Sequence, residues 1–336
     1  PDIARSFGMV LFEKNNDKIE LHLSSAEMDL SFLPVFVPEI EWWHGKGSLN
    51  LNIEGTINQP KLNGYFYSRA NNIKVKMLPE PLINTQLNLI LERDYIKLQN
   101  CRAETKIKGK VEVDGLIRLV PIKNATPKTH AFFSLFTFHY DIKIKTNNFR
   151  LFTDFFTGKI RTNNLQFKGS GKDYSLQGDL LLYDGEYKLR PSKSTAQLPD
   201  IVLDLKLNIG KAVAFKMEKN IFSPHEFNPI DIDVPLSGVI KVEGTLNNLA
   251  LDGEIQAIGR GSLGLLTARR YFEFEITEAK ATFHPELGIF PDLVFKAQTN
   301  YAESPSVYVD DPGVITIFLE YKGSLKDIGS KYILKR

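Results

Sequence analysis

Two glycine-rich stretches of the sequence carry residue types that are used in phosphate chemistry. Residues 169–172 read Gly-Ser-Gly-Lys, like the end of a phosphate-binding loop. Gln166 stands where that motif needs its first glycine, and a strand pattern follows where it needs a helix. Residues 259–264 lack the preceding buried strand and the following helix of a dinucleotide site. The first stretch is therefore no nucleotide site, and the second is better explained as a hairpin or a bulge.

The histidines and the paired carboxylates do not form a catalytic or metal-binding pattern. No two histidines stand at metal-ligand spacing, and the six are His22, His44, His130, His139, His225 and His284. Asp231 and Asp233 lie on one face of a strand, as do Glu273 and Glu275, and no nucleophile or base accompanies either pair. Charges on the solvent side of a strand explain both pairs equally well. We therefore expect no enzymatic activity, no metal and no cofactor.

The charge balance and the single cysteine exclude further classes of protein. Lys and Arg number 42 and Asp and Glu 40, spread along the whole length, which leaves no basic footprint for nucleic acid. Cys101 is the only cysteine, so neither an intramolecular disulfide nor a cysteine-based zinc site can form. No apolar run approaches the roughly 18 residues of a spanning helix. Because no cationic, apolar leader follows Pro1, we expect a soluble piece of a longer protein.

Short alternating runs of apolar and polar residues dominate the chain. The clearest covers residues 201–209, which puts five aliphatic residues on one side and, apart from Val202, polar residues on the other. Similar runs, bounded by Gly, Pro, Asn or Asp, indicate about twenty strands of ordinary length. Almost nothing is long enough for a helix, although residues 25–28 predict one capped helical turn. The sequence therefore predicts an all-β protein.

One hairpin pattern recurs along the chain. Residues 55–64 and 244–253 both begin and end with glycine, nine positions apart, and share a Thr, an Asn and a Leu between them. Asn247 and Asn248 are the predicted turn of the second copy. A looser copy covers residues 169–178, and another begins at Gly323. Because the copies are unevenly spaced, we expect an irregular array of hairpins that extends one long object.

The pattern lapses once, in a stretch that contains Pro121, Pro127 and several phenylalanines. We therefore predict an upstream groove segment over residues 1–120, a loop or break over 121–139, and a C-terminal groove segment over 140–336 that continues the first. The phenylalanines of residues 132–138 either form an exposed lipid or partner contact or cover an edge of the core.

An antiparallel sheet with one apolar face must cover that face. We predict a long antiparallel sheet that curls along its length into a U-shaped hydrophobic trough; the alternative is an elongated β-sandwich filled by its own side chains. An open trough would suit acyl chains, because each buried methylene contributes roughly 0.8 kcal/mol wherever it lies. The predicted groove-lining residues are Leu49, Leu51, Ile53, Leu203, Leu205, Leu207, Ile240, Val242, Phe272, Phe274, Ile276, Ile315 and Ile317.

The glycine-and-turn phrase of residues 47–64 resembles the repeats of the TamB family, the translocation and assembly module proteins with AsmA-like relatives. Residues 28–33, the Trp-Trp-His-Gly-Lys-Gly entry at 42–47 and the run 82–115 are similar to the region upstream of that family's conserved C-terminal domain. Residues 238–323 look like the C-terminal domain itself. The resemblance thus covers most of the chain.

The resemblance implies a curled sheet, the β-taco, in the periplasm or an equivalent intermembrane space. It implies an anchor in the inner membrane, supplied by a segment missing from this chain, and an outer-membrane BamA-like barrel as partner through parts mostly outside it. Its ligands would be phospholipid acyl chains, and its function would be to conduct glycerophospholipids between inner and outer membrane. The alternative is a scaffold for assembly or secretion of outer-membrane β-barrel proteins, which would receive polypeptide by strand addition.

Overall fold

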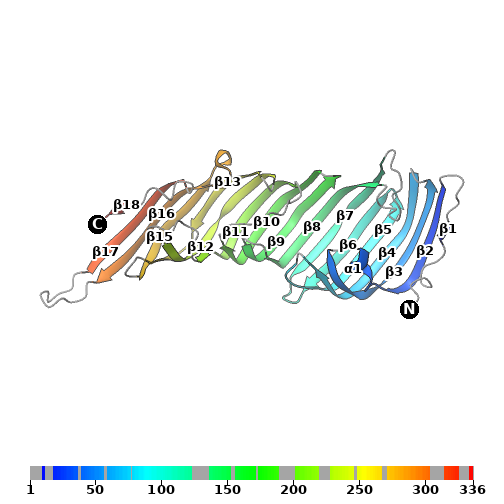
Figure 1. Ribbon diagram of the computed structural model, residues 1–336, viewed down its shortest axis with the longest axis horizontal. Helices are drawn as coiled ribbons and strands as arrows, with labels where there is room; N and C mark the ends of the chain where they lie inside the picture. The colour runs from blue at the N-terminus through cyan, green and yellow to red at the C-terminus, as the bar shows by residue number, and fades with distance from the viewer. Residues whose placement is uncertain are drawn as a thin grey trace. The chain divides into compact units, whose positions relative to one another are not determined.

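The structure is a computed structural model of the chain (Figure 1). It describes residues 10–11, 18–36, 39–56, 59–76, 78–122, 136–152, 156–171, 173–188, 201–218, 228–245, 248–266, 271–302, 314–324 and 333–335. These residues form eighteen β-strands, one short α-helix and one 3-10 turn. The strands belong to a single sheet. The prediction of an all-β fold built on a long antiparallel sheet is confirmed.

The chain divides into two compact units, each described here by itself. The first comprises residues 1–150, 160–179 and 199–202, and the second comprises 151–159, 180–198 and 203–336. Four strands contribute residues to both units: β8 (Phe136–Phe152), β9 (Phe156–Ser170), β10 (Asp173–Lys188) and β11 (Ile201–Glu218).

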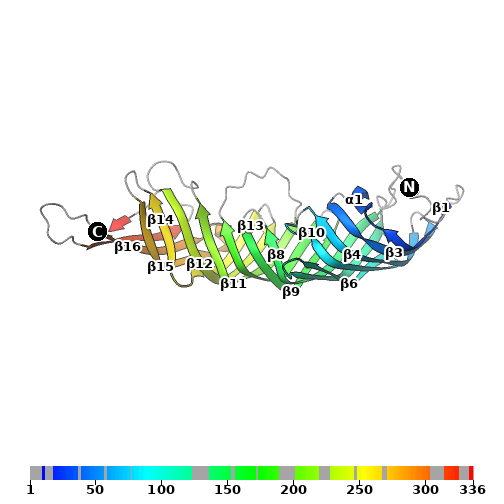
Figure 2. The same ribbon diagram turned by 90° about the horizontal axis from the view of Figure 1, so that it is seen from below.

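The first unit is a meander of antiparallel strands. Successive strands from β1 to β8 pair as neighbours. Besides its shares of β8, β9, β10 and β11, its elements are β1 (Val10–Leu11), β2 (Lys18–Asp29), α1 (Leu33–Phe36), β3 (Ile40–Thr56), β4 (Gln59–Val75), β5 (Leu82–Arg93), β6 (Tyr95–Thr105) and β7 (Lys110–Pro121). Figures 1 and 2 both place α1 beside β3.

The second unit is also antiparallel, with one interruption. Besides its shares of β8, β9, β10 and β11, its strands are β12 (Asn228–Thr245), β13 (Asn248–Ala257), β14 (Gly261–Leu266), β15 (Tyr271–Phe283), β16 (Asp292–Ala302), β17 (Val314–Ser324) and β18 (Ile333–Lys335), with the 3-10 turn η3 at Pro285–Leu287. Both β13 and β14 pair with β12 on one side and β15 on the other. Residues 258–260 therefore interrupt one long strand, in the manner of the predicted bulge and not of a hairpin.

The recurring hairpin has the same register in both of its close copies. Gly64 of β4 lies opposite Leu51, and Gly253 of β13 lies opposite Ile240, which is the equivalent position. In the looser copy, a Cβ on Gly178 would lie 2.6 Å from the carbonyl oxygen of Asn164. The prediction of the turn needs a correction, because Asn248 pairs with Thr245 and belongs to β13. The two-residue connection is 246–247, which lies outside the described residues, as does most of the copy that begins at Gly323.

The second glycine of this hairpin carries a testable stability effect. Gly253 has φ +128°, and a Cβ there would overlap the carbonyl oxygen of Val239 across the ladder. We expect Gly253→Ala to lower the free energy of unfolding by about 3 kcal/mol, since it adds backbone strain to a clash with fixed main chain. Gly259→Ala is the matched control, with φ +83° and open space around a Cβ, and should cost about 1 kcal/mol. Urea unfolding followed by circular dichroism measures both, and equal losses would contradict the steric explanation.

Two further predictions from the sequence can be compared with the structure. The helical turn predicted at residues 25–28 is wrong, because they lie in β2, where a register shift falls between Ser25 and Met28. The one short α-helix follows at Leu33–Phe36, where Leu33 can turn back onto the sheet. Of the predicted break at 121–139, residues 123–135 lie outside the described residues, while β7 and β8 pair as far as Pro121 and Phe136. The predicted domain division stays a prediction.

Candidate functional site

The strands of both units separate apolar from charged side chains. On β11 Leu203 and Leu205 are buried, whereas Asp204 between them and Lys206 after them are exposed. On β8 the residues from Phe138 to Thr146 alternate in the same way, with His139 and the other odd-numbered residues exposed. This alternation follows from the period of two in a strand. Each unit therefore has one apolar face.

In the first unit the apolar side chains form a row that crosses the strands. Leu21, Ile53 and Leu62 are direct neighbours on β2, β3 and β4. Ile53 and Leu62 pack together with two more fully buried residues and four partly buried ones, contributed by strands from β2 to β8: Leu91, Leu119, Leu21, Leu51, Ile96 and Phe138. Because every strand adds a residue to the row, the row lengthens with the number of strands. An apolar ligand would therefore find no single position of strongest binding along it.

An aromatic row continues this face in the first unit. Tyr140 lies two residues after Phe138 on β8, and the two rings stack with centroids 6.2 Å apart. Tyr140 also contacts Phe167 of β9 and Tyr174 of β10, whose rings stack on one another at 5.6 Å. Burial raises the pKa of the Tyr140 phenol above its ordinary value. These rings thus present a neutral surface to anything that lies along the face.

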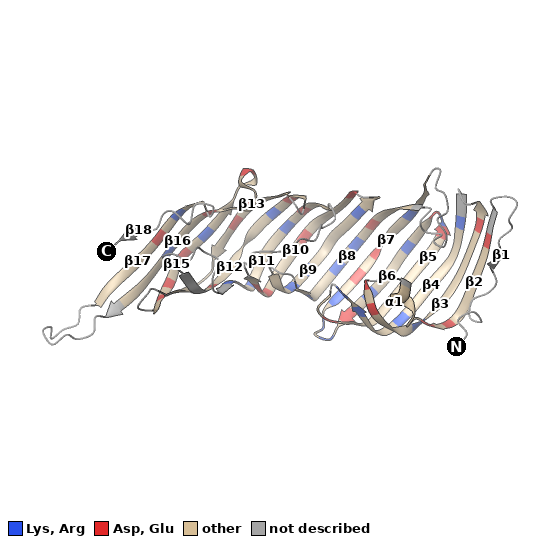
Figure 3. Ribbon diagram, in the orientation of Figure 1, with Lys and Arg blue, Asp and Glu red and all other residues tan. Residues whose placement is uncertain are grey.

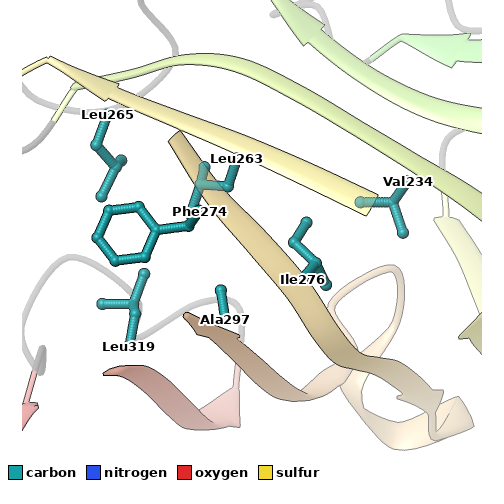
Figure 4. Close-up of a cluster of buried hydrophobic side chains, with 7 residues drawn as sticks. All are labelled: Val234, Leu263, Leu265, Phe274, Ile276, Ala297 and Leu319. Carbon is teal, nitrogen blue, oxygen red and sulfur yellow. The ribbon is translucent and has the colours of Figure 1, made fainter. Parts of the chain in front are cut away.

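The second unit has a larger apolar cluster, drawn in Figure 4. Phe274 of β15 points toward Leu265 of β14 and Leu319 of β17, and Ala297 of β16 lies beside them (Figure 4). Ile276, only 1% exposed, is the most deeply buried of the cluster. Partly buried residues extend the cluster from β11 to β17, among them Phe215, Leu236, Phe272, Phe295 and Ile317. In the strand register Ala297 lies opposite Ile276.

The opposite faces carry charges that pair across neighbouring strands. Examples are Glu27 with Lys46 at 2.8 Å in the first unit and Glu278 with Lys296 in the second. Figure 3 shows both signs distributed along the strands of each unit. Such exposed pairs stabilise a sheet weakly. They form no surface of one sign of the kind that recruits nucleic acid.

All thirteen predicted groove residues lie within described strands. Seven are buried, namely Ile53, Leu203, Leu205, Ile240, Val242, Phe274 and Ile276. Six are half-buried, namely Leu49, Leu51, Leu207, Phe272, Ile315 and Ile317. The structure brings Phe272, Phe274, Ile276 and Ile317 into one cluster of the second unit. Leu51 and Ile53 join one cluster of the first unit, and Leu49 joins another.

Sequence reasoning missed several residues of the apolar faces. Leu62, Leu91 and Leu119 belong to the row of the first unit, and Leu263 and Leu265 to the cluster of the second. A signal for Leu62 was present, since both close copies of the hairpin carry a leucine two residues before their last glycine. Leu263 and Leu265 alternate with Ser262 and Gly264, a pattern hidden by the glycines that flank it.

The lone cysteine is built into the first unit as an apolar residue. Cys101 on β6 is 2% exposed, and its Sγ lies 3.5 Å from the backbone nitrogen of Asn88. Burial raises the pKa of the thiol, which disfavours the reactive thiolate. We expect iodoacetamide at pH 8 to alkylate Cys101 in the folded protein about a hundredfold more slowly than in urea, as measured by mass spectrometry. Similar rates in both conditions would contradict the burial.

The described part of the chain holds neither a metal-binding cluster nor a membrane-spanning helix. No group of three or more His, Cys, Asp or Glu side chains is placed to hold a metal ion there. Among the same residues, no helix has both the length and the apolar character that crossing a membrane requires.

Comparison with known proteins gives one family. The model of the TamB C-terminal domain matches residues 5–198, which is more than half of the chain. Among curated proteins, no sequence matches. The match corrects the placement of that domain, since residues 28–115 lie inside the matched range and residues 238–323 lie beyond it. The glycine-and-turn phrase recurs in every segment and therefore cannot mark a position along the family's sequence. This chain, with its antiparallel strands and one-sided apolar faces, belongs to the TamB family.

Proposed function

We propose that this chain is part of a lipid-conducting scaffold of the cell envelope. TamB proteins belong to the machinery that moves lipid or protein through the envelope, and the family is one of transport and scaffold proteins. Our proposal is that the apolar faces line a groove that takes the acyl chains of glycerophospholipids and leads them between inner and outer membrane. No bond is made or broken in this process.

One observation carries the proposal, which is the apolar row that passes from strand to strand in the first unit. It includes a residue from each of β2, β3, β4, β5, β6, β7 and β8, without a charged side chain among its members. An acyl chain that moved along such a row would exchange one set of aliphatic contacts for an equivalent set. The free energy of the bound lipid would then vary little with position, which favours movement over tight binding.

The thirteen predicted groove residues have the same role in this proposal in both units. The polar head group would stay in water at the lip, since no charged side chain is among the thirteen. The periplasm or an equivalent intermembrane space is the compartment that such a conduit requires. An inner-membrane anchor and an outer-membrane BamA-like barrel would be the attachments at its two ends, through segments mostly outside this chain.

Photocrosslinking from the apolar face tests the proposal. A photoreactive phenylalanine in place of Leu205, within the full-length protein in cells, should give adducts with glycerophospholipid that mass spectrometry identifies. The matched control is the same residue in place of Lys206, which is exposed on the other face of β11 and should give none. Adducts at Leu205 with nascent outer-membrane barrel strands, and none with lipid, would replace the proposal by an assembly scaffold.

A further inference from the structure

A short segment of the first unit lies on the apolar face instead of continuing it. Residues 30–36, here called the plug segment, follow β2 and include α1. Leu30 is fully buried, and Phe32 and Leu33 pack against the same cluster, which contains Met28, Trp43, Ala70 and Ile73. Leu49, one of the predicted groove residues, packs there too. The plug segment therefore covers part of the surface that the proposed function assigns to lipid.

Two glycines of β3 form the bed of the plug segment. A Cβ on Gly47 would lie 2.9 Å from Leu30 Cδ1, whereas one on Gly45 would lie 2.5 Å from the backbone of Ala70 on the paired strand β4 and would not meet the plug segment. The backbone nitrogen of Leu30 donates to the carbonyl oxygen of Gly45 at 3.0 Å. The Trp-Trp-His-Gly-Lys-Gly entry thus has a physical role, because a side chain at position 47 would displace Leu30.

The plug segment is weakly held for a buried element. Its helix is a single turn of four residues, which has little stability of its own. Val35 on its outer side is 79% exposed, so only one side of the segment packs on the sheet. The hydrogen bonds Leu33 N to Leu30 O and Val35 N to Phe32 O are internal to the segment and would survive its displacement. The segment is held to β3 by the backbone hydrogen bond from Leu30 N to Gly45 O and by apolar contact with its cluster.

Two buried polar atoms of this region point to a ligand. The indole Nε1 of Trp43 and the hydroxyl of Thr85 have no hydrogen-bond partner among the described residues. Both side chains are at least nine-tenths buried, Trp43 within the cluster that Leu30 contacts and Thr85 beside Ala70 in the strand register. Buried donors are nearly always paired in proteins, so an unpaired one is a place for an absent acceptor.

We propose that the plug segment occupies a lipid subsite, and that a diacyl lipid replaces it. One acyl chain takes the space of Leu30, Phe32 and Leu33, and an ester carbonyl of the lipid accepts a hydrogen bond from Trp43 Nε1, with Thr85 as a second partner. This inference rests on the proposed function. It adds a position that recognises the ester of the lipid and a segment of the chain itself that competes with the lipid for the same site. A polypeptide would fit the bed less well, because its many backbone donors and acceptors exceed the two polar atoms available.

Quenching of Trp43 by brominated lipid tests the competition. In a Trp42→Phe background Trp43 is the sole tryptophan, and phosphatidylcholine vesicles brominated in mid-chain quench it on contact. We expect Leu30→Ser with Phe32→Ser to raise quenching about threefold, since the plug segment no longer competes. Val35→Ser is the control within the plug segment and should leave quenching unchanged. Should the double variant fail to fold, Leu30→Ala weakens the same contact more gently and should act in the same direction.

Ester recognition is tested separately with labelled lipids. The chain with the weakened plug segment should bind diacyl phosphatidylcholine about tenfold better than the dialkyl ether of equal chain length, because only the ester offers a carbonyl to Trp43. Trp43→Phe in that chain should strongly reduce the preference, since only Thr85 remains as a donor, while circular dichroism stays unchanged. Equal binding of ester and ether lipids before the substitution would overturn the assignment of Trp43 as the ester donor. Equal quenching in the plug variants and the parent would overturn the proposal that the plug segment competes with lipid. If lipid adducts still form at Leu205 in either case, the proposed function stands and only this inference fails.

Discussion

Leu205→Arg is expected to abolish lipid transfer by the full-length protein. Leu205 on β11 is 7% exposed and lies on the apolar face between Leu203 and Leu207. An arginine there places a charge in the path of the acyl chains, and an uncompensated buried charge costs several kcal/mol. Transfer of fluorescent phospholipid between donor and acceptor vesicles measures the effect, with an expected loss of about a hundredfold or more.

The same strand offers a matched control for this substitution. Val202 is 51% exposed on the opposite face of β11, so Val202→Arg adds the same side chain to the solvent side. It should leave transfer within about twofold of the parent. Leu205→Thr shortens the side chain and adds one hydroxyl, which reduces transfer while disturbing the fold less than a charge does. Circular dichroism and the unfolding midpoint of each variant separate loss of transport from loss of fold.

The outcome that contradicts the groove is transfer by Leu205→Arg at the rate of the parent, with the variant folded. The apolar face of β11 would then be a structural core. Loss of transfer in both arginine variants would point instead to a general effect of added positive charge. Only a loss confined to position 205 supports a path for lipid along the apolar face.

The fold was predictable because its cause is local. A strand that buries one face must alternate, and residues 201–209 do so over a length that leaves no doubt about the side of each leucine. The hairpin copies were predictable for the same reason, since Gly64 and Gly253 occupy positions where the partner strand admits no side chain. The nine-residue spacing of the glycines thus reflects one register used twice.

The plug segment was not predictable, because nothing local distinguishes it from a strand end. Residues 25–28 carry capping residues that favour a helical turn, yet they pair with β3 around a register shift. The short helix forms four residues later because Leu30, Phe32 and Leu33 find an apolar surface. That surface comes from strands up to sixty residues further along, such as the one carrying Leu87. Tertiary packing, not propensity, decides such a case.

The sequence predicted which residues belong to the candidate site, but not where in the structure these residues meet. Alternation tells which side of a strand is apolar, but it does not tell which residues of different strands meet. Leu49 and Leu51 stand two residues apart on β3. Leu49 packs with the cluster that contains Leu30 of the plug segment, whereas Leu51 packs with the apolar row from β2 to β8. Register shifts, such as the one between His44 and Gly45, move the pairing along each strand and are not visible in the composition of the run.

Phe274→Ala is expected to produce the largest loss of stability, about 3–5 kcal/mol in the free energy of unfolding. Phe274 is 4% exposed and lies between Leu265 and Leu319 in the cluster of the second unit (Figure 4), so its ring leaves a cavity that neighbouring strands cannot close. Phe318→Ala is the matched control, since Phe318 is 48% exposed on β17 and its removal should cost less than about 1 kcal/mol. Urea unfolding followed by circular dichroism compares them. If the two losses of stability were equal, the side chains of the cluster would be loosely packed. A lipid chain could then occupy the space within the cluster without a large cost in stability.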